Sequence, residues 1–279
     1  MENLRESSEP YKFREYIEKS ISELKEAKER SLDLEVVIPI GRKHADESPA
    51  FITLGDSDVN VEIVGQHGVG KLELIKSMLC SLSELYKQEE VECYYIDTTM
   101  CDTINAGEDG FEILYDSGIK SEQDVIRFIT EWIPNKLGGR LAAIGSAEVT
   151  TVKQYNKVSR DRMVPIIIVV NELKRLLSNS AIDSDTKIKL NKSIEEVMLL
   201  GRTCGIHIIT TNTFSSTLKE SDSVSKLSNT KIYLKMNAAM QEALQLDNST
   251  MADLNRYGMA YLKYATGDMI KIEFPYTGK

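Results

Sequence analysis

Short, continuous apolar runs alternate along the chain with longer stretches in which apolar residues recur every three or four positions. The most hydrophobic run, Pro-Ile-Ile-Ile-Val-Val at 165–170, is β-branched and is typical of a strand buried on both faces. Similar runs occupy 61–64, 91–97 and 206–211, and stretches with helical spacing lie between them. This alternation predicts an α/β domain with a mainly parallel sheet flanked by helices, with these four strands at its centre.

The two ends of the chain carry different patterns. Residues 1–31 are rich in Glu and Lys and predict an amphipathic helix, which either lies on the domain or links it to a preceding one. The apolar positions at helical spacing are Phe13, Ile17, Ile21 and Leu24. Near the other end, residues 259–264 and 269–274 flank a Thr-Gly-Asp turn and predict a β-hairpin. We therefore divide the chain into a linker helix, residues 1–31, and an α/β domain, residues 32–279.

Three further segments have weaker patterns. Residues 34–41 predict an edge strand, because Pro39 cannot donate a hydrogen bond within a central ladder. Residues 111–115 predict another strand. The mixed segment 134–162 contains a Gly-Gly pair and a polar stretch, and we expect surface helix and mobile loop there.

A glycine-rich turn joins the run at 61–64 to the helix that follows it. Residues 65–72 read Gly-Gln-His-Gly-Val-Gly-Lys-Leu, and strand, glycine-rich turn, lysine and helix in this order form the pattern of a phosphate-binding loop. The glycines let backbone N–H groups converge on an anion, and the lysine adds a charge for the outer phosphates. The alternative is a tight strand-to-helix turn without a ligand. The candidate nucleotide-binding residues are Gly65, Gln66, His67, Gly68, Val69, Gly70, Lys71 and Leu72.

Two positions depart from the chemistry of an active nucleotide site. A hydroxyl residue normally follows the lysine to hold Mg²⁺, and here that position is Leu72. The strand at 165–170 ends in Asn171-Glu172, where a hydrolase normally has an Asp for the metal and a Glu for the attacking water. Asparagine has an oxygen but no charge, so it should hold a divalent ion more weakly. Glu172 remains as a vestigial catalytic residue, and its alternative role is a helix-start carboxylate.

One more polar residue completes the candidate site. The strand at 206–211 is followed by Asn212, at the place where a γ-phosphate sensor would lie. With both metal positions altered, we expect ATP to bind weakly or not at all, and we expect Mg²⁺ not to bind. His207 lies within the same strand, and we interpret it as a core residue rather than a catalyst.

Composition narrows the class of partner. The net charge is −9, whereas a nucleic-acid motor is expected to carry a basic stripe for the phosphate backbone. The acidity therefore argues against nucleic acid as a partner. The four cysteines show no spacing that suits zinc. No apolar run reaches the ~20 residues that span a bilayer, so any membrane anchor would lie outside this chain.

The order of these motifs resembles the FtsK/SpoIIIE family of RecA-like motor ATPases, over roughly residues 34–275. The segment 201–212 is similar to the family's RxxGIHLILATQ string, with Asn212 at the Gln position. The other segments that carry the resemblance are the loop at 65–72, the strand ending in Asn171-Glu172, and the closing strands at 230–236 and 257–261. The resemblance implies a RecA-like P-loop fold.

One branch of the family has degenerate motifs. The coupling proteins of Gram-positive type VII secretion, called EssC in firmicutes and EccC in actinobacteria, carry tandem domains of this type, and the downstream domains often lose motif residues. Residues 37–41, Val-Ile-Pro-Ile-Gly, are similar to the IPxG start of those domains. Together with Leu72 and Asn171, this makes the chain resemble the last ATPase domain of such a protein.

That resemblance implies a cytoplasmic domain of a bacterial, membrane-anchored protein. Its partners would be secreted WXG100-type substrates and the preceding ATPase domains of the same chain, with a homo-hexamer as the assembly of the full-length protein. Its role would be substrate recognition and regulation of the secretion motor. The alternatives are an active ATP-hydrolysing translocase of proteins and, less favoured because of the acidity, a DNA translocase.

Overall fold

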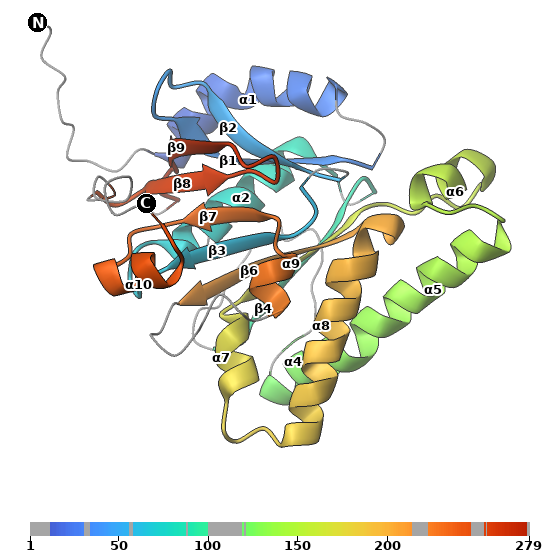
Figure 1. Ribbon diagram of the computed structural model, residues 1–279. Coiled ribbons are helices and arrows are strands. Elements are labelled where there is room, and N and C mark those ends of the chain that lie inside the picture. The colour runs from blue at the N-terminus through green and yellow to red at the C-terminus, as the bar shows by residue number, and fades with distance from the viewer. Residues whose placement is uncertain are drawn as a thin grey trace, which may run out of the picture.

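A nine-stranded sheet runs through the described part of the protein, with the strand order β2-β1-β9-β8-β7-β3-β6-β5-β4 (Figure 1). The computed structural model describes residues 12–30, 34–55, 58–87, 89–99, 119, 121–213, 223–246, 254 and 256–277. The strands are β1 (Val36–Lys43), β2 (Pro49–Leu54), β3 (Val61–Gly65), β4 (Glu92–Asp97), β5 (Ile166–Asn171), β6 (Ile206–Thr213), β7 (Thr230–Tyr233), β8 (Met259–Lys263) and β9 (Met269–Glu273).

The sheet has a parallel half and an antiparallel half. Strands β7, β3, β6, β5 and β4 pair in parallel, whereas β2, β1, β9, β8 and β7 pair antiparallel. The predicted α/β class is confirmed, and the sheet that we expected to be mainly parallel is parallel in the first of these halves. Val169, in the most hydrophobic run, is buried between the two neighbouring strands of β5.

Two strand positions differ from the prediction. β4, which we expected at the centre, lies at an edge of the described sheet and pairs with β5 alone. Its apolar pattern has another cause, because helices cover both of its faces: Cys93 belongs to the core on one side and Ile96 to the core on the other. β1, which we expected at an edge, lies between β2 and β9. It accommodates Pro39 because β9 pairs only with Arg42 and Lys43, beyond the proline.

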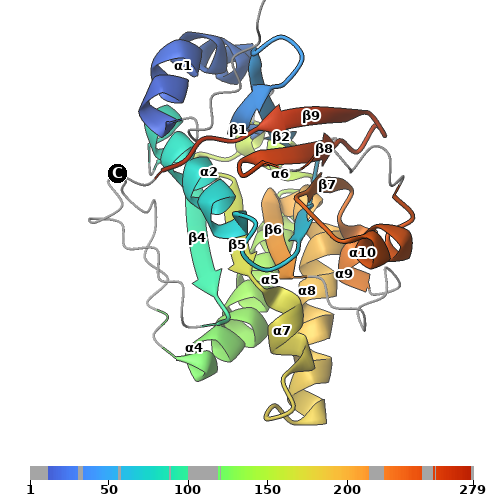
Figure 2. The same cartoon turned by 90° about the vertical axis from the view of Figure 1, so that its left-hand side faces the viewer.

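Helices cover both faces of the sheet (Figure 2). On one face α1 and α2 pack on β1, β2 and β3, and Tyr16 and Leu24 of α1 are fully buried there. On the other face the α4–α8 region packs on β4, β5 and β6. The helices are α1 (Phe13–Arg30), α2 (Lys71–Leu85), α4 (Glu122–Arg127), the π-helix η1 (Phe128–Trp132), α5 (Ile133–Ser146), α6 (Val152–Val158), α7 (Leu173–Ser178), α8 (Ser184–Cys204), α9 (Ser223–Leu227) and α10 (Ala238–Ala243).

Local sequence signals explain where several helices begin. Four helices begin after a side chain that accepts a hydrogen bond from a backbone amide three residues later, which satisfies one of the free donors at a helix start. These residues are Ser121 before α4, Thr151 before α6, Asp183 before α8 and Asn237 before α10. Gly205 ends α8 in the left-handed conformation, with a φ of 67°.

The remaining segment predictions have mixed outcomes. The surface helix expected within 134–162 is confirmed, because α5 and α6 occupy most of this segment, and its Gly-Gly pair lies inside α5. Residues 147–151 and 159–162 lie outside these helices, and the mobility expected of the loop stays a prediction. The strand expected at 111–115 lies outside the described residues. The division at residue 31 remains a prediction.

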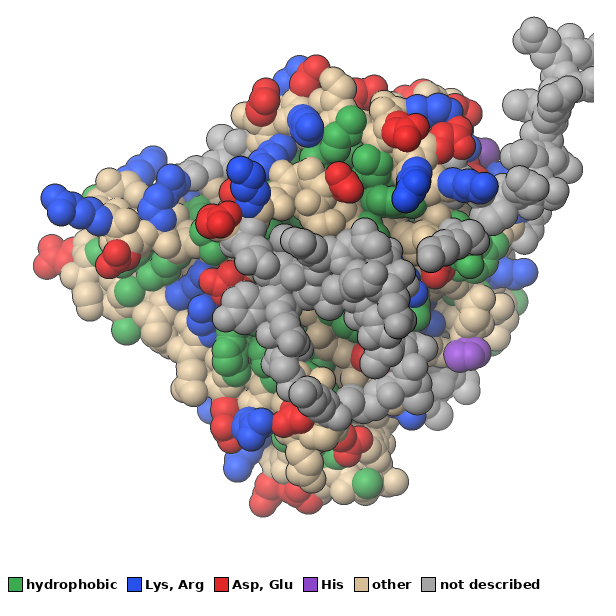
Figure 3. Space-filling view, turned by 180° about the vertical axis from the view of Figure 1, so that it is seen from behind, with side chains coloured by type: hydrophobic (Ala, Val, Ile, Leu, Met, Phe, Trp, Pro, Cys, Tyr) green, Lys and Arg blue, Asp and Glu red, His purple; other side chains and the backbone are tan. Residues whose placement is uncertain are grey.

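Charges of both signs are interspersed over the part of the surface that Figure 3 shows outside the grey atoms. None of the helices in the described ranges is long and apolar enough to cross a membrane.

Candidate functional site

The glycine-rich loop connects β3 to α2 at the carboxyl end of the parallel strands. Gly68 and Gly70 have left-handed φ angles of 76° and 97°, a conformation that strongly favours glycine. The amides of residues 67–70 donate no hydrogen bond within the described chain. Free amides at a helix N-terminus form a cradle for an anion, so the loop fits the phosphates of a nucleotide.

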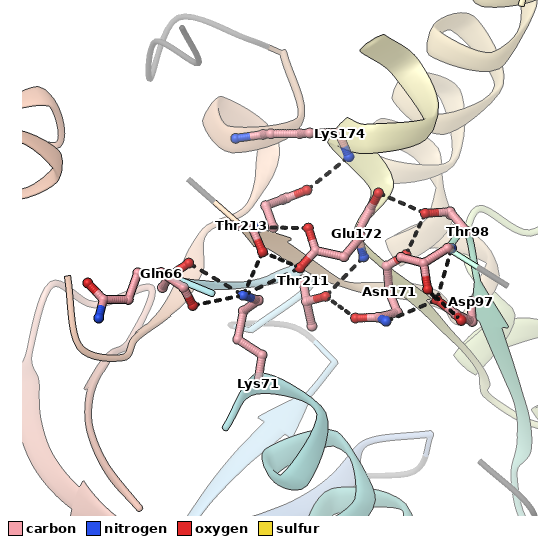
Figure 4. A network of polar contacts seen from close by, with 12 residues as sticks. Gln66, Lys71, Asp97, Thr98, Asn171, Glu172, Lys174, Thr211 and Thr213 are labelled. Carbon is pink, nitrogen blue, oxygen red and sulfur yellow. Dashed lines mark hydrogen bonds and ion pairs between the residues drawn. The ribbon is translucent and has the colours of Figure 1, made fainter. Parts of the chain in front are cut away.

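Lys71 begins α2, and its ammonium group points back toward the loop (Figure 4). Its Nζ donates to Oγ1 of Thr213 at 2.7 Å, to the carbonyl oxygen of Gln66 at 3.1 Å and to that of Gly65 at 3.4 Å. Oε1 of Glu172 lies 3.4 Å away. The side chain is only 8% exposed, so its charge is compensated inside the protein before any ligand arrives.

Glu172 lies between β5 and α7 in the left-handed conformation, with a φ of 55°. Its carboxylate accepts hydrogen bonds from the backbone N–H of Thr213, at 2.8 Å, and from the Thr213 hydroxyl. It makes no capping hydrogen bond to α7, so the alternative role as a helix-start carboxylate is not the one the side chain performs. Instead, it joins Lys71 and Thr213 in one polar cluster.

Asn171 lies next to this cluster, and both polar atoms of its side-chain amide form hydrogen bonds. Its Nδ2 donates to Oδ1 of Asp97 at 3.0 Å, and its Oδ1 accepts from the Thr211 hydroxyl (Figure 4). Leu72, at the other metal position, packs against the hydrophobic core beneath α2. An apolar side chain and an occupied amide supply no charged ligand, so these two positions do not fit Mg²⁺.

Asn212 is not brought to the loop. Side chains alternate between the two faces of a sheet, so Asn212 points away from the face that carries Lys71. Its Nδ2 donates to Oε1 of Glu62 at 2.9 Å, and its Oδ1 accepts from the Lys174 amide at 3.0 Å. The polar side chain of β6 that reaches Lys71 is Thr213, one residue further along, which the sequence analysis missed. Burial does not distinguish the two faces of β6, because residues 206–212 are all buried, so the sequence contained no simple signal for Thr213.

Glu62 is a buried carboxylate in the strand that leads into the loop. Ion pairs join it to Lys174, at 2.9 Å, and to Lys231, at 3.8 Å. Ser225 Oγ donates to its Oε2 at 2.7 Å, and Asn212 donates to its Oε1. Burial alone would raise the pKa of Glu62, but the charge of Lys174, the Ser225 hydrogen bond and Lys231 together hold it below its ordinary value.

Two aromatic rings flank the loop, and these also were not predicted. A Cβ atom at Gly70 would lie 3.1 Å from Cζ of Tyr257 and 3.2 Å from Cζ of Phe274. Tyr257 is 47% exposed, and its partial burial, together with the nearby charge of Glu73, raises its pKa to about 12. His67, at the tip of the loop, is exposed. The loop therefore has a polar side, toward β6, and an aromatic side, toward β8 and β9.

The remaining candidate groups have structural roles. His207 is buried, with Nδ1 lying 3.0 Å from the carbonyl oxygen of Val59, as expected for a core residue. Across the described ranges, no three His, Cys, Asp or Glu side chains gather in a way that could hold a metal ion.

Known proteins share both the sequence pattern and the fold. The profile of the FtsK/SpoIIIE family matches residues 21–249. Comparison of the sequence with curated proteins gives no match. Solved structures share the fold, and three of them, each at less than 25% sequence identity, are described next.

The first is the cytoplasmic domain of the type VII secretion ATPase EccC from Thermomonospora curvata, with a TM-score of 0.66 and 19% identity over 88% of this chain and 29% of that one. The second is the pCW3 conjugation coupling protein TcpA with ATPγS, with a TM-score of 0.65 and 17% identity over 89% of this chain and 68% of that one. The third is ATPases 2 and 3 of Thermomonospora curvata EccC in complex with a signal sequence peptide, with a TM-score of 0.65 and 15% identity over 87% of this chain and 41% of that one. The chain thus spans about a third of the EccC cytoplasmic domain.

Proposed function

This chain belongs to the FtsK/SpoIIIE family, whose profile covers most of it, and from this premise we propose that it is a degenerate ATPase domain of a type VII secretion coupling protein. In this role it binds ATP weakly and without Mg²⁺, hydrolyses it negligibly, and acts in substrate recognition and in regulation of the motor. The fold that it shares with EccC domains supports the secretion context.

The observation that carries the degenerate character is the engagement of the residues at the metal positions. Leu72 contributes to a core, and both polar atoms of the Asn171 amide are hydrogen-bonded inside the protein. Phosphoryl transfer relies on a metal to neutralise the developing charge, and losing that charge raises the barrier by several kcal/mol, with each ~1.4 kcal/mol slowing the reaction about tenfold.

The anion cradle supports binding in spite of this loss. The free amides of residues 67–70 and the Lys71 ammonium would hold the phosphates, whereas Glu172 and Thr213 already compensate the lysine charge. An incoming phosphate must therefore compete with an internal carboxylate for the same ammonium. We expect this competition to weaken binding.

Calorimetric titration of ATP with and without Mg²⁺, beside a phosphate-release assay, tests the proposal. We expect weak binding that changes little with Mg²⁺, and no measurable turnover. Lys71→Ala should weaken binding about tenfold or more, because hydrogen bonds to charged groups contribute about 1.5–3 kcal/mol. Lys235→Ala is the matched control, since this lysine is exposed and its hydrogen bond with the loop, accepted from the Gln66 amide, is made by its backbone carbonyl.

Turnover of about 1 s⁻¹ or faster that depends on Lys71 would instead identify an active motor, and the proposal of a degenerate site would then be abandoned.

For partners, we propose secreted substrates of the small, helical WXG100 type and not nucleic acid. The resemblance to EssC and EccC proteins supports this assignment, as does the EccC structure that holds a signal sequence peptide. The net charge of −9 disfavours a phosphate backbone. In the full-length protein the domain would follow other ATPase domains of the same chain, in a homo-hexamer on the cytoplasmic side of the membrane.

A pull-down with a WXG100-type protein, compared with duplex DNA over a series of salt concentrations, tests the choice of partner. We expect the protein to be retained and the DNA to pass through. Retention of DNA alone, lost at high salt, would refute this choice of partner.

A further inference from the structure

A basic cleft lies between the end of α9, the start of β7 and the turn that joins β8 to β9, away from the glycine-rich loop. Its volume is about 740 Å³. Three of its lining residues are lysines, Lys226, Lys231 and Lys263, and the other residues that line it are Ser, Asn, Tyr, Ala, Thr and Gly. In an acidic chain, a cleft lined by three lysines and by no Asp or Glu is an unusual local concentration of positive charge.

The strand pairing places two of these lysines side by side. Lys231 of β7 and Lys263 of β8 are directly opposite each other across the two strands, and like charges in this arrangement destabilise a sheet. Lys226 and Lys263 are exposed and form no ion pair in the described part of the chain. An anion bound between the lysines would relieve the repulsion.

Lys231 gives the cleft one fixed charge. Its side chain is 12% exposed, and Nζ lies 3.1 Å from Oγ of Ser225 and 3.8 Å from Oε2 of Glu62. Two carboxylates beside the cleft are hydrogen-bonded to residues of its lining: Asp58 accepts from the Ala265 amide, and Asp268 accepts from the Thr266 hydroxyl. The cleft therefore combines one positioned lysine with two exposed ones, whose flexible side chains are long enough to adapt to a ligand.

We propose that this cleft binds a short acidic peptide segment, with carboxylates paired to Lys226, Lys231 and Lys263. The volume exceeds what a single small anion needs, and hydroxyl, amide and aromatic side chains in the lining suit the backbone and side chains of a peptide. A long polyanion such as nucleic acid would meet the negative charge of the rest of the molecule, whereas a short acidic segment would meet mainly the cleft.

Fluorescence anisotropy with a labelled peptide rich in Glu, and with its counterpart in which Gln replaces each Glu, tests the site. We expect the Glu peptide to bind, the Gln peptide to bind far less, and added salt to weaken the complex. Lys226→Gln and Lys263→Gln should each weaken binding about two- to fivefold, the range for one exposed ion pair, and the double variant should weaken it further. Lys189→Gln removes an exposed lysine on α8, outside the cleft, and should leave binding unchanged.

Both test lysines are exposed, so their substitution leaves the core intact, and circular dichroism of each variant checks this directly. Equal binding of the Glu and Gln peptides, no binding at all, or equal losses for Lys189→Gln and the cleft variants would overturn the proposal. Tighter binding of a single-stranded oligonucleotide, reduced by the cleft variants, would also overturn it and would assign the cleft to nucleic acid.

Discussion

At the scale of single residues, the buried carboxylate of Glu62 provides a test of electrostatic stabilisation. It is fully buried in β3, and four side chains from four other elements compensate its carboxylate. Removing one partner from a buried, hydrogen-bonded charge cluster leaves the others uncompensated. A substitution of Glu62 therefore tests whether this charge cluster stabilises the fold.

We expect Glu62→Gln to destabilise the protein by about 3–5 kcal/mol near neutral pH, because Lys174 and Lys231 would lose the buried carboxylate that they share. The pKa of Glu62 lies below its ordinary value of 4.5 in the folded state. Its contribution is therefore complete above that value and is lost as the pH falls through the lowered folded pKa. The difference between wild type and variant should shrink accordingly in acid.

Urea unfolding, followed by the fluorescence of Trp132, provides the measurement. Trp132 is the single tryptophan and stacks on Phe128 with ring centroids 4.5 Å apart. Glu84→Gln, at an exposed position on α2, is the control and should change stability little at any pH. A Glu62→Gln deficit that stayed constant from neutral pH into acid would contradict the assignment of a lowered pKa.

At the scale of elements, α5 contains two glycines that weaken it. Gly138 and Gly139 lie in the middle of the helix and are exposed, and a Cβ atom at either position would meet nothing within 4 Å. Glycine in a helix interior costs about 0.5–1 kcal/mol relative to alanine. We expect Gly138→Ala and Gly139→Ala each to raise the free energy of unfolding by about this amount, as measured by urea denaturation.

Gly201 of α8 is the matched comparison, where we expect alanine to lower the free energy of unfolding. A Cβ atom there would lie 2.2 Å from the carbonyl oxygen of Ile206, so Gly201→Ala forces the helix away from β6 and should destabilise the protein. Destabilisation by the two α5 substitutions as well would show that the glycines of α5 have a role beyond conformational freedom.

A tertiary contact explains why α5 forms although its sequence indicated part loop. Buried Arg140 donates to the carbonyl oxygens of Cys204, at the end of α8, and Val164, both at 2.7 Å. A pattern of propensities along one segment contains no information about carbonyl groups that lie 24 and 64 residues away.

At the scale of the whole molecule, the sequence predicted the parts of the fold that depend on local periodicity. The buried runs at 61–64, 165–170 and 206–211 all form strands of the parallel half, and the glycine-rich loop lies between β3 and α2. The sequence did not predict the order of the strands, because burial by helices gives the edge strand β4 the same apolar pattern as a central strand.

The same limit applies to the candidate site. The loop glycines and Lys71 follow a spacing that is local in the chain, and the structure places Lys71 beside Glu172. The contacts of Thr213 and Asn212 depend on which face of β6 each side chain occupies. The contact of Tyr257 with the loop depends on the folding of a segment far from the loop in the sequence. A motif places a residue along a strand, but a shift of one residue moves the side chain to the other face.

The strand order also bears on the sequence of events in which the sheet assembles during synthesis. The β1–β2 hairpin connects to the rest of the described sheet only through β9, where Arg42 and Lys43 pair with Glu273 and Ile272. Chains emerge from the ribosome N-terminal end first, so β1 and β2 leave the ribosome well before β9 has been made. The described sheet can close only after β9 has emerged, and until then one edge of β1 is open to pairing with other chains.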